Sequence, residues 1–410
     1  MKRYLIIGNG VAAVGCIEGI RSQDGKGEIT IVSEEKRPVY GRPLISYYLM
    51  GKTDLGKMNY RPADFYEGNG CRVIYGKRAV ALDPEKKTAT LDDGTALPYD
   101  ELCVAAGSRP FAPPFEGLDS VGKKFSFMTL DDALSLEGAL DKSARVLIVG
   151  AGLIGLKCAE GIRDRVGSIT VCDLADRVLS SILDAECAAV VRKSLEKSGI
   201  EFLLGDTAVK FDGGTAHMKS GKTVDFDLLV LAVGVRANVE LVKDAGGTVN
   251  RGIVVDRKMQ TSVPSVYAAG DCAEGFDASI GANRVIAILP NAYLQGHAAG
   301  VNMAGGDASQ NDAIPMNSIG FFGLHIMTAG AYDGELTEEK TEGGIKRFFV
   351  KDGLLRGYIL IGETERAGIY TSLIREKTPL DTVDFDLTKK VASNLIFSRE
   401  NRRKKFGGVV

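Results

Sequence analysis

The sequence predicts an α/β protein with two similar parallel-sheet domains and a smaller α+β domain after them. Three observations predict this class. A short apolar run followed by a glycine turn occurs at residues 4–13 and again at residues 146–155. A third glycine-containing strand motif lies at residues 261–272, and from about residue 311 such motifs give way to alternating short strands. Strands that alternate with helices in this way are typical of α/β folds.

The composition fits a multidomain globular protein without a charge bias. A chain of 410 residues corresponds to two or three domains at roughly 100–200 residues each. The 51 basic and 53 acidic side chains give a formal net charge of −2, which argues against a nucleic-acid partner. The 50 glycines exceed the average usage of roughly 7% and predict tight turns and close backbone approaches to ligands. No apolar stretch reaches the ~18 residues of a membrane helix.

The cysteines predict a cytoplasmic protein. The chain has seven, at positions 16, 71, 103, 158, 172, 187 and 272. None forms a Cys-x-x-Cys pair, and the odd number fits no closed disulfide framework. We therefore expect reduced thiols, no metal site and a cytoplasmic location. The apolar N-terminus resembles a secretory signal, but Gly8 and Gly10 interrupt it.

The first unit begins with the strand-like run Tyr4–Ile7 and continues through Gly8-Asn9-Gly10-Val11-Ala12-Ala13 into a small-residue helix. The run Ile29–Ser33 then precedes Glu34, which lies 26 residues after the first glycine. This order of strand, glycine turn, helix, strand and carboxylate is the dinucleotide-binding fingerprint.

The second unit repeats this order. The run Val146–Val149 precedes Gly150-Ala151-Gly152-Leu153-Ile154-Gly155, and Ile169–Cys172 precedes Asp173, 23 residues after the first glycine. In such a turn, glycines let the backbone approach a pyrophosphate at a helix N-terminus, and the carboxylate accepts hydrogen bonds from a ribose. Asp173 therefore favours NADH over NADPH, although Arg177 is a possible partner for a 2′-phosphate.

The parallel continues beyond each fingerprint. Hairpin-like stretches with turn residues follow at 82–94 and 212–221, and each leads to an apolar strand that ends at glycine, Leu102–Gly107 and Leu228–Gly234. The sequence therefore predicts two Rossmann-like dinucleotide-binding domains.

The motif Thr261–Cys272, together with Tyr40–Ser46 and Leu289–Ala292, carries a resemblance to a known family. The chain resembles the two-dinucleotide-binding flavoproteins related to pyridine nucleotide–disulfide reductases, in particular their NADH:rubredoxin and ferredoxin reductase branch. The resemblance covers residues 1 to about 305. It implies that the first unit holds FAD and the second holds NADH.

The resemblance also implies site residues and domain boundaries. The residues expected to bind FAD are Gly8, Gly10, Val11, Ala12, Ala13, Glu34, Arg42, Pro43, Val80, Ala106, Gly107, Gly270, Asp271, Pro290 and Asn291. For NADH they are Gly150, Gly152, Leu153, Ile154, Gly155, Asp173, Val233 and Gly234. The FAD domain would be discontinuous, at 1–112 and 250–310, with the NAD(H) domain at 113–249 and an interface domain at 311–410.

The chain departs from the family in two ways. Residues 40–60 contain no cysteine, so we expect no thiol relay beside the flavin, and Cys16, Cys158 and Cys272 are expected to be small buried residues. Lys157 replaces a glutamate that many relatives carry near the nicotinamide. It is a candidate to tune the flavin or to hold the carboxamide, but we expect it to lie on a helix face and point to water.

The expected chemistry is hydride transfer. His217, His297 and His325 belong to no nucleophile or general-base pattern, and no Gly-x-Ser-x-Gly elbow or metal cluster occurs. This fits a mechanism in which NADH passes hydride to the flavin, since the cofactors carry the chemistry and the protein aligns them.

Three functions remain open. The first is an NADH-dependent flavoprotein reductase for an iron–sulfur protein, which is either a rubredoxin or ferredoxin or a partner subunit of a larger enzyme, such as a tungsten aldehyde oxidoreductase or a 2-oxoacid dehydrogenase complex. The second is an NADH oxidase, or a reductase of quinones or other small acceptors. The third is a non-catalytic flavin-binding protein that senses redox state. A homodimer is also open.

The C-terminal region predicts a small α+β domain. Strands are expected at Ile345–Val350 and Gly357–Gly362, and a helix at Arg366–Ile374. The basic run Ser398–Lys405 is read as a solvated tail, with docking onto an acidic electron carrier or a partner subunit as the alternative.

Overall fold

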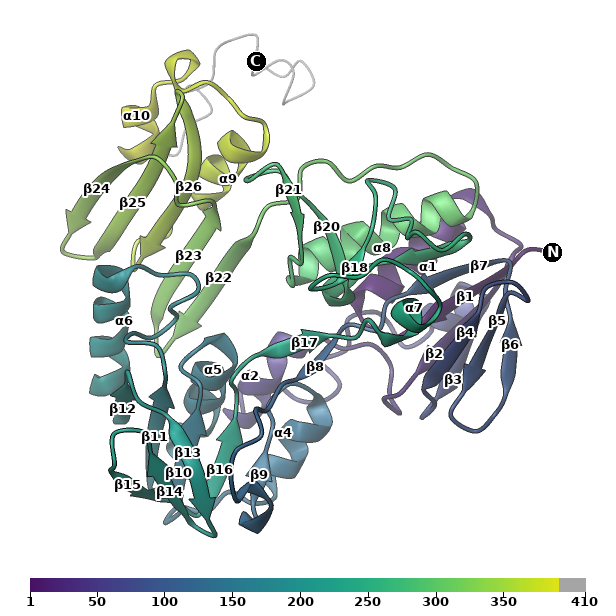
Figure 1. Cartoon of the computed structure of the whole chain (residues 1–410). Helices are drawn as coiled ribbons and strands as arrows, with labels where there is room; N and C mark the ends of the chain where they lie inside the picture. The colour runs from purple at the N-terminus through teal and green to yellow at the C-terminus, as the bar shows by residue number, and fades with distance from the viewer. Residues whose placement is uncertain (391–410) are drawn as a thin grey trace. The chain divides into compact units, whose positions relative to one another are not determined.

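The computed structural model describes residues 1–390. It divides into two compact units, residues 1–275 with 283–310 and residues 276–282 with the chain from 311 onward. The larger unit contains two parallel sheets, and the smaller unit contains one antiparallel sheet (Figure 1). The basic run Ser398–Lys405 lies outside the described residues.

The first parallel sheet has the order β19-β7-β1-β2-β3. Its strands are β1 (Arg3–Ile7), β2 (Glu28–Ser33), β3 (Cys71–Tyr75), β7 (Glu101–Val104) and β19 (Val266–Ala268). Every neighbouring pair is parallel. We call this sheet the first lobe, together with its helices α1 (Val11–Gln23), α2 (Ile45–Leu49), α3 (Phe65–Gly68), α7 (Glu240–Asp244) and α8 (Leu289–Met303).

The second parallel sheet has the order β12-β11-β10-β16-β9. Its strands are β9 (Lys124–Phe125), β10 (Arg145–Val149), β11 (Ser168–Asp173), β12 (Ile200–Leu204) and β16 (Leu228–Leu231). With its helices α4 (Leu130–Glu137), α5 (Leu153–Ile162) and α6 (Ala185–Lys197) it forms the second lobe. Starting from β10, the strand order repeats that of the first lobe starting from β1, so the predicted duplication is confirmed.

Each lobe carries an antiparallel three-stranded sheet where a hairpin was expected. These sheets are β4 (Ala79–Asp83), β5 (Thr88–Leu91) and β6 (Ala96–Pro98), and β13 (Ala208–Asp212), β14 (Thr215–Met218) and β15 (Thr223–Asp225). A ribbon of β8 (Ser108–Pro110) and β17 (Val235–Ala237) connects the lobes. A further small sheet contains β18 (Ile253–Val254), β20 (Ala273–Asp277) and β21 (Ala282–Arg284).

Helices α1 and α8 of the first lobe pack backbone against backbone. A Cβ atom at Gly15, Gly19, Gly296 or Gly300 would lie 1.9–2.3 Å from a carbonyl oxygen of the facing helix, well inside contact distance. The contacts advance in step along both helices, so the two helices run parallel and their N-termini lie at the same end. Part of the glycine excess therefore serves helix packing rather than ligand approach.

The smaller unit is an α+β fold, as expected. Its sheet has the order β22-β23-β26-β25-β24, built from β22 (Met316–Phe321), β23 (Leu324–Gly330), β24 (Glu335–Thr341), β25 (Gly344–Lys351) and β26 (Leu354–Ile361). Helix α9 (Ala367–Arg375) packs on this sheet through Tyr370, which meets Phe348 and Tyr358 edge to face. Helix α10 (Phe385–Lys390) follows.

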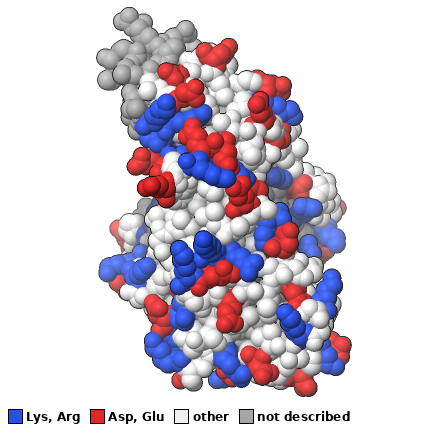
Figure 2. Space-filling model, turned by 90° about the vertical axis from the view of Figure 1, so that its left-hand side faces the viewer, with Lys and Arg blue, Asp and Glu red and all other residues white. Residues whose placement is uncertain are grey.

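The surface carries charges of both signs. On the face drawn in Figure 2, Lys and Arg side chains alternate with Asp and Glu side chains. Among the described residues, no helix is long and apolar enough to cross a membrane.

Candidate functional site

The two glycine turns have the same backbone geometry. Gly8 and Gly150 have positive φ angles of 107° and 118°. A Cβ at Gly8 would lie 2.1 Å from the carbonyl oxygen of Ala105, and one at Gly150 would lie 2.2 Å from that of Ala232. Both the left-handed conformation and the close approach of the next strand exclude a side chain. The first glycine of each motif is therefore required by the fold itself.

The second glycine of each turn leaves open space. Gly10 is the N-cap of α1 and Gly152 is the N-cap of α5, both with extended backbone and no capping side chain. A Cβ at either position would meet no atom within 4 Å. The backbone N–H groups of a first helical turn have no partner within the helix, and they attract anions. Each turn is thus a cradle of the kind that holds a dinucleotide pyrophosphate.

The remaining fingerprint positions line the first turn of each helix. Ala13 is fully buried, and Gly155 allows no side chain because its Cβ would lie 2.0 Å from the carbonyl oxygen of Gly150. The other residues of these two turns are Val11, Ala12, Leu153 and Ile154.

The two predicted ribose carboxylates differ in their surroundings. Glu34 follows β2 and is exposed. Asp173 ends β11, and its carboxylate accepts hydrogen bonds from the N–H groups of Ala151 (2.6 Å) and Ala175 (2.8 Å). The backbone of the glycine turn therefore orients Asp173. Arg177 donates to the carbonyl oxygen of Leu183 and to a neighbouring carboxylate, so part of its donor set is already used.

The strands that end at glycine lie next to the two turns. Gly107 and Gly234 have positive φ angles and open space at Cβ. The side-chain amide of Asn238 donates to the carbonyl oxygen of Ala106 (2.8 Å), and its backbone N–H donates to that of Gly107 (3.0 Å). Asn238 thus stabilises the turn from the lobe-connecting ribbon, and sequence reasoning missed it. Val233, one residue before Gly234, is half-buried.

Asp271 lies in a 3₁₀ turn, Gly270–Cys272, directly after β19. Burial raises the pKa of its carboxyl group, and the positive charge of Arg42 acts in the opposite direction. The backbone N–H of Gly270 donates to the side-chain oxygen of Gln295 (2.9 Å), which ties this turn to α8. A half-buried carboxylate close to the first turns of α8 suits the polar part of a flavin dinucleotide.

Other predicted FAD positions are distributed around this turn. Arg42 and Pro43 lie in the 3₁₀ turn η1 (Arg42–Leu44), where Arg42 donates to Glu35 at 2.6 Å. Pro290 lies in the first turn of α8. Asn291 is buried and donates to the carbonyl oxygen of Ile286, so its side chain stabilises the helix start.

Val80 lies on β4, with 45% of its surface exposed.

Lys157 does not point to water, and that expectation is wrong. Its side chain is only 18% exposed and forms an ion pair with Glu160, one turn further along α5. Its ammonium group also lies over the ring of Tyr47, 4.8 Å from the centroid. Helix α2 covers this face of α5, and that contact removes the lysine from solvent.

The cysteines are free thiols, and six of the seven are buried. Cys16, Cys158 and Cys272 are fully buried, as expected, and all seven thiols are free. Burial raises the pKa of Cys272 to about 12, so the thiol stays protonated at neutral pH. Within residues 1–390, no group of histidine, cysteine and acidic side chains could hold a metal ion.

Comparison with known proteins gives one family. Residues 2–296 match the family model described as pyridine nucleotide-disulphide oxidoreductase. The NADH-dependent phenylglyoxylate dehydrogenase subunit epsilon of Aromatoleum evansii is 32% identical over 414 residues, which cover 97% of this chain and 96% of the relative.

A second relative is longer. The assimilatory nitrate reductase electron transfer subunit of Bacillus subtilis strain 168 is 30% identical over 402 residues, but the match covers 95% of this chain and only 50% of the relative. Among solved structures, the ferredoxin reductase for the CYP199A2 system of Rhodopseudomonas palustris superposes with a TM-score of 0.85 at 26% identity, over 96% of this chain and 100% of that one.

Proposed function

Because the chain belongs to the pyridine nucleotide-disulphide oxidoreductase family, we propose that it carries electrons from NADH to an iron–sulfur protein outside the chain. It is an NADH-dependent flavoprotein oxidoreductase with FAD as its cofactor. Bound in the first cradle, FAD would supply the redox chemistry, which is to take up a hydride and pass on its electrons. The residues of this chain bind, orient and shield the two nucleotides.

The observation that carries the proposal is the pair of matched cradles. Gly10 and Gly152 are the N-caps of α1 and α5, and a Cβ at either position would meet no atom within 4 Å. Each helix N-terminus is therefore accessible to a pyrophosphate. We assign FAD to the first cradle, where α8 begins at the same end as α1 and the turn that carries Asp271 is tied to α8 through Gln295. NADH is assigned to the second, where Asp173 disfavours a 2′-phosphate.

The chemistry near the flavin requires an external acceptor. Residues 40–60 contain no cysteine, and among the described residues no metal-binding cluster occurs. Within residues 1–390, electrons therefore have no metal cluster to receive them, and the segment 40–60 offers no thiol. A one-electron carrier such as a rubredoxin or ferredoxin, or a cluster-bearing partner subunit, suits this role.

We favour a partner subunit as the acceptor. Two relatives are named as subunits, of a phenylglyoxylate dehydrogenase and of an assimilatory nitrate reductase. The first of these is matched over nearly its whole length, and phenylglyoxylate is a 2-oxoacid. The proposal is therefore that the chain is the NADH-reacting subunit of a larger oxidoreductase, of which a 2-oxoacid dehydrogenase is the leading example.

We further propose the boundaries that the duplication suggests. The FAD domain comprises 1–112 and 250–310 together with α7, whose Val242 is buried in the core of the first lobe; the NAD(H) domain comprises the rest of 113–249, and the interface domain 311–410. The seven free thiols support a cytoplasmic location.

The test is native purification followed by assays with defined acceptors. Co-purifying proteins are identified by mass spectrometry, and NADH turnover is measured with oxygen alone and with the co-purified iron–sulfur protein. We expect the carrier or partner to be reduced at least tenfold faster than oxygen. Equal rates with oxygen would favour an NADH oxidase, and flavin reduction far slower than metabolism would favour a redox sensor.

A further inference from the structure

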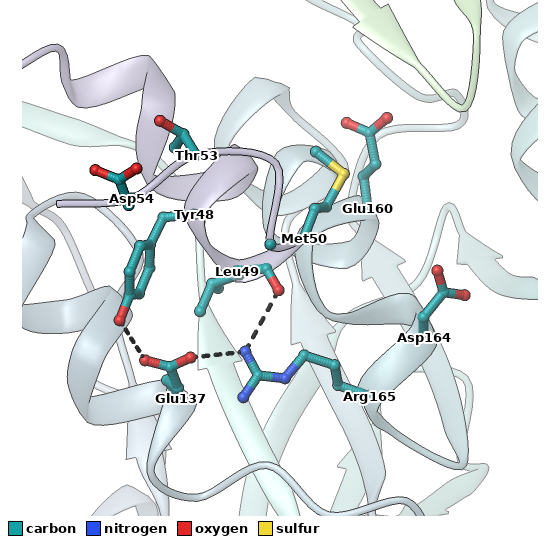
Figure 3. A pocket seen from close by; sticks show the side chains of 11 residues that line it. Tyr48, Leu49, Met50, Thr53, Asp54, Glu137, Glu160, Asp164 and Arg165 are labelled. Atoms are coloured by element: carbon teal, nitrogen blue, oxygen red, sulfur yellow. Dashed lines mark hydrogen bonds and ion pairs between the residues drawn. The ribbon is translucent and has the colours of Figure 1, made fainter. Parts of the chain in front are cut away.

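The short helix α2 of the first lobe is held by two elements of the second lobe (Figure 3). The Tyr48 hydroxyl donates to Oε2 of Glu137 at 2.8 Å. Arg165 donates through one nitrogen to Oε1 of Glu137 at 2.8 Å and to the carbonyl oxygen of Leu49 at 3.3 Å. We call these four residues the α2 clamp. A single carboxylate, at the end of α4, thus joins α2 to Arg165 in the 3₁₀ turn η3 (Arg163–Arg165) after α5.

The clamp is charged at neutral pH and is not deeply buried. Burial acts to raise the pKa of Glu137, but the hydrogen bonds from Arg165 and Tyr48 outweigh it and lower the pKa. The side chains of Arg165 and Glu137 are 35% and 30% exposed. Replacing one of them therefore leaves no fully buried charge, so clamp variants are expected to fold.

The clamp lies beside other contacts between the lobes, since the N–H of Leu130 at the start of α4 donates to the hydroxyl of Tyr40 at 2.8 Å and Arg37 forms an ion pair with Asp131. A cavity of about 420 Å³ lies beside the clamp, and Tyr48, Met50, Glu137 and Arg165 are among its lining residues. On the far side of α2 the packing is close, since a Cβ at Gly161 of α5 would lie 3.3 Å from the carbonyl oxygen of Ser46. Helix α2 therefore packs closely on α5 on one side and is hydrogen-bonded by the clamp on the other.

The position of α2 connects the two cradles. Helix α2 continues directly from η1, where Arg42 is bound to Glu35 and acts electrostatically on Asp271 of the FAD cradle. Helix α5, which α2 contacts, starts at Gly152 of the NADH cradle. A shift of α2 against the second lobe would change the separation of the two bound nucleotides.

We infer that the α2 clamp positions the NADH-binding lobe against the flavin, so that Tyr48, Glu137 and Arg165 are positioning residues for hydride transfer. This inference rests on the proposed function. Hydride transfer requires reacting atoms about 3–3.5 Å apart, and a misplacement of ~1 Å can cost ~100-fold in rate. The clamp should therefore affect the transfer step and leave the binding of each nucleotide to its own lobe unchanged.

The test compares Tyr48→Phe and Glu137→Gln with wild type. The matched control is Glu196→Gln, which removes a carboxylate paired with Arg192 at 2.7 Å inside α6, away from the lobe contact. Three quantities are measured on the FAD-loaded protein: the limiting rate of flavin reduction at saturating NADH, the Kd of NAD⁺ by calorimetry, and amide hydrogen exchange of residues 45–54.

The inference predicts that both clamp variants lose at least threefold in limiting rate and exchange faster over residues 45–54, with the Kd of NAD⁺ within twofold of wild type. The control should change none of the three. A limiting rate within threefold of wild type would overturn the inference, as would a loss confined to NAD⁺ affinity. Tyr48→Phe removes only a hydroxyl group, so it keeps the test decisive if Glu137→Gln folds poorly. Failure of NADH to reduce the wild-type flavin would instead refute the proposed function.

Discussion

Replacing Gly10 with valine should produce a folded protein without FAD. Gly10 has φ −97° and ψ −167°, which valine adopts readily, and its Cβ would meet no atom within 4 Å. Valine is a poorer N-cap than glycine, which should lower the free energy of unfolding by only about 1 kcal/mol. In the FAD complex, however, the branched side chain would occupy the space that the pyrophosphate needs. Losing two charge-assisted hydrogen bonds at about 1.5–3 kcal/mol each weakens binding by roughly 10²–10⁴-fold.

The assay is the ratio of flavin to protein absorbance after purification, with circular dichroism to establish folding. Two further glycine variants are measured in the same assay for comparison. Gly8→Val should not fold, because its Cβ would lie 2.1 Å from a carbonyl oxygen at a φ of 107°. Gly152→Val should remain yellow but lose reduction by NADH. A Gly10→Val protein with normal FAD content would refute the assignment of the first cradle, and an unfolded one would refute the reasoning from open space.

Three further predictions concern specificity, packing and pH. Asp173→Ser should weaken NADH binding by about 1–3 kcal/mol and narrow the preference over NADPH; wild-type kinetics that favour NADPH would contradict it. Gly296→Ala should destabilise the protein by about 1–3 kcal/mol or more, because its Cβ would lie 1.9 Å from a carbonyl oxygen of α1. Gly68→Ala is the control: its Cβ would meet no atom within 4 Å, so it should change the unfolding free energy by less than about 0.5 kcal/mol. Equal destabilisation by the two variants would contradict the close packing of α1 and α8. Hydrogen bonds from the side chain and backbone of Arg3 lower the pKa of Asp100 to about 2, so this pair stabilises the fold above pH ~4 and the stabilisation is lost as the pH falls toward 2. Asp100→Asn should accordingly lower the melting temperature at pH 7 and lower it less near pH 2. An equal decrease at both pH values would contradict a stabilisation by Asp100 that depends on its ionisation.

Local sequence patterns predicted the parts of the fold that depend on neighbouring residues. The two glycine turns, their carboxylates and the strands that end at glycine all lie where the patterns placed them. The reason is physical: a tight turn with positive φ at Gly8 and Gly150 needs glycine, and a buried parallel strand needs a continuous apolar run. The duplication was predicted as well, and the strand order of one lobe recurs in the other.

Features that depend on contacts between distant residues were not predictable. Asn238 binds the turn at Ala106, 132 residues away, and no local pattern marks it. The pair of Lys157 and Glu160 has the i, i+3 spacing of one helix face, which was a usable signal. Its burial under Tyr47, however, depends on α2 from the other lobe. The glycines of α1 and α8 repeat every four residues, a usable signal for close helix packing that the sequence reasoning missed.

We expect NADH to reduce a flavin that has no thiol partner, and the electrons then to leave the chain. The most direct measurement is an anaerobic titration of the purified yellow protein with NADH, followed by absorbance. The account predicts complete bleaching at one equivalent of NADH per FAD, a total uptake of two electrons, and reoxidation on addition of the iron–sulfur partner. Uptake of four electrons per FAD, or a flavin that NADH does not bleach, would contradict it.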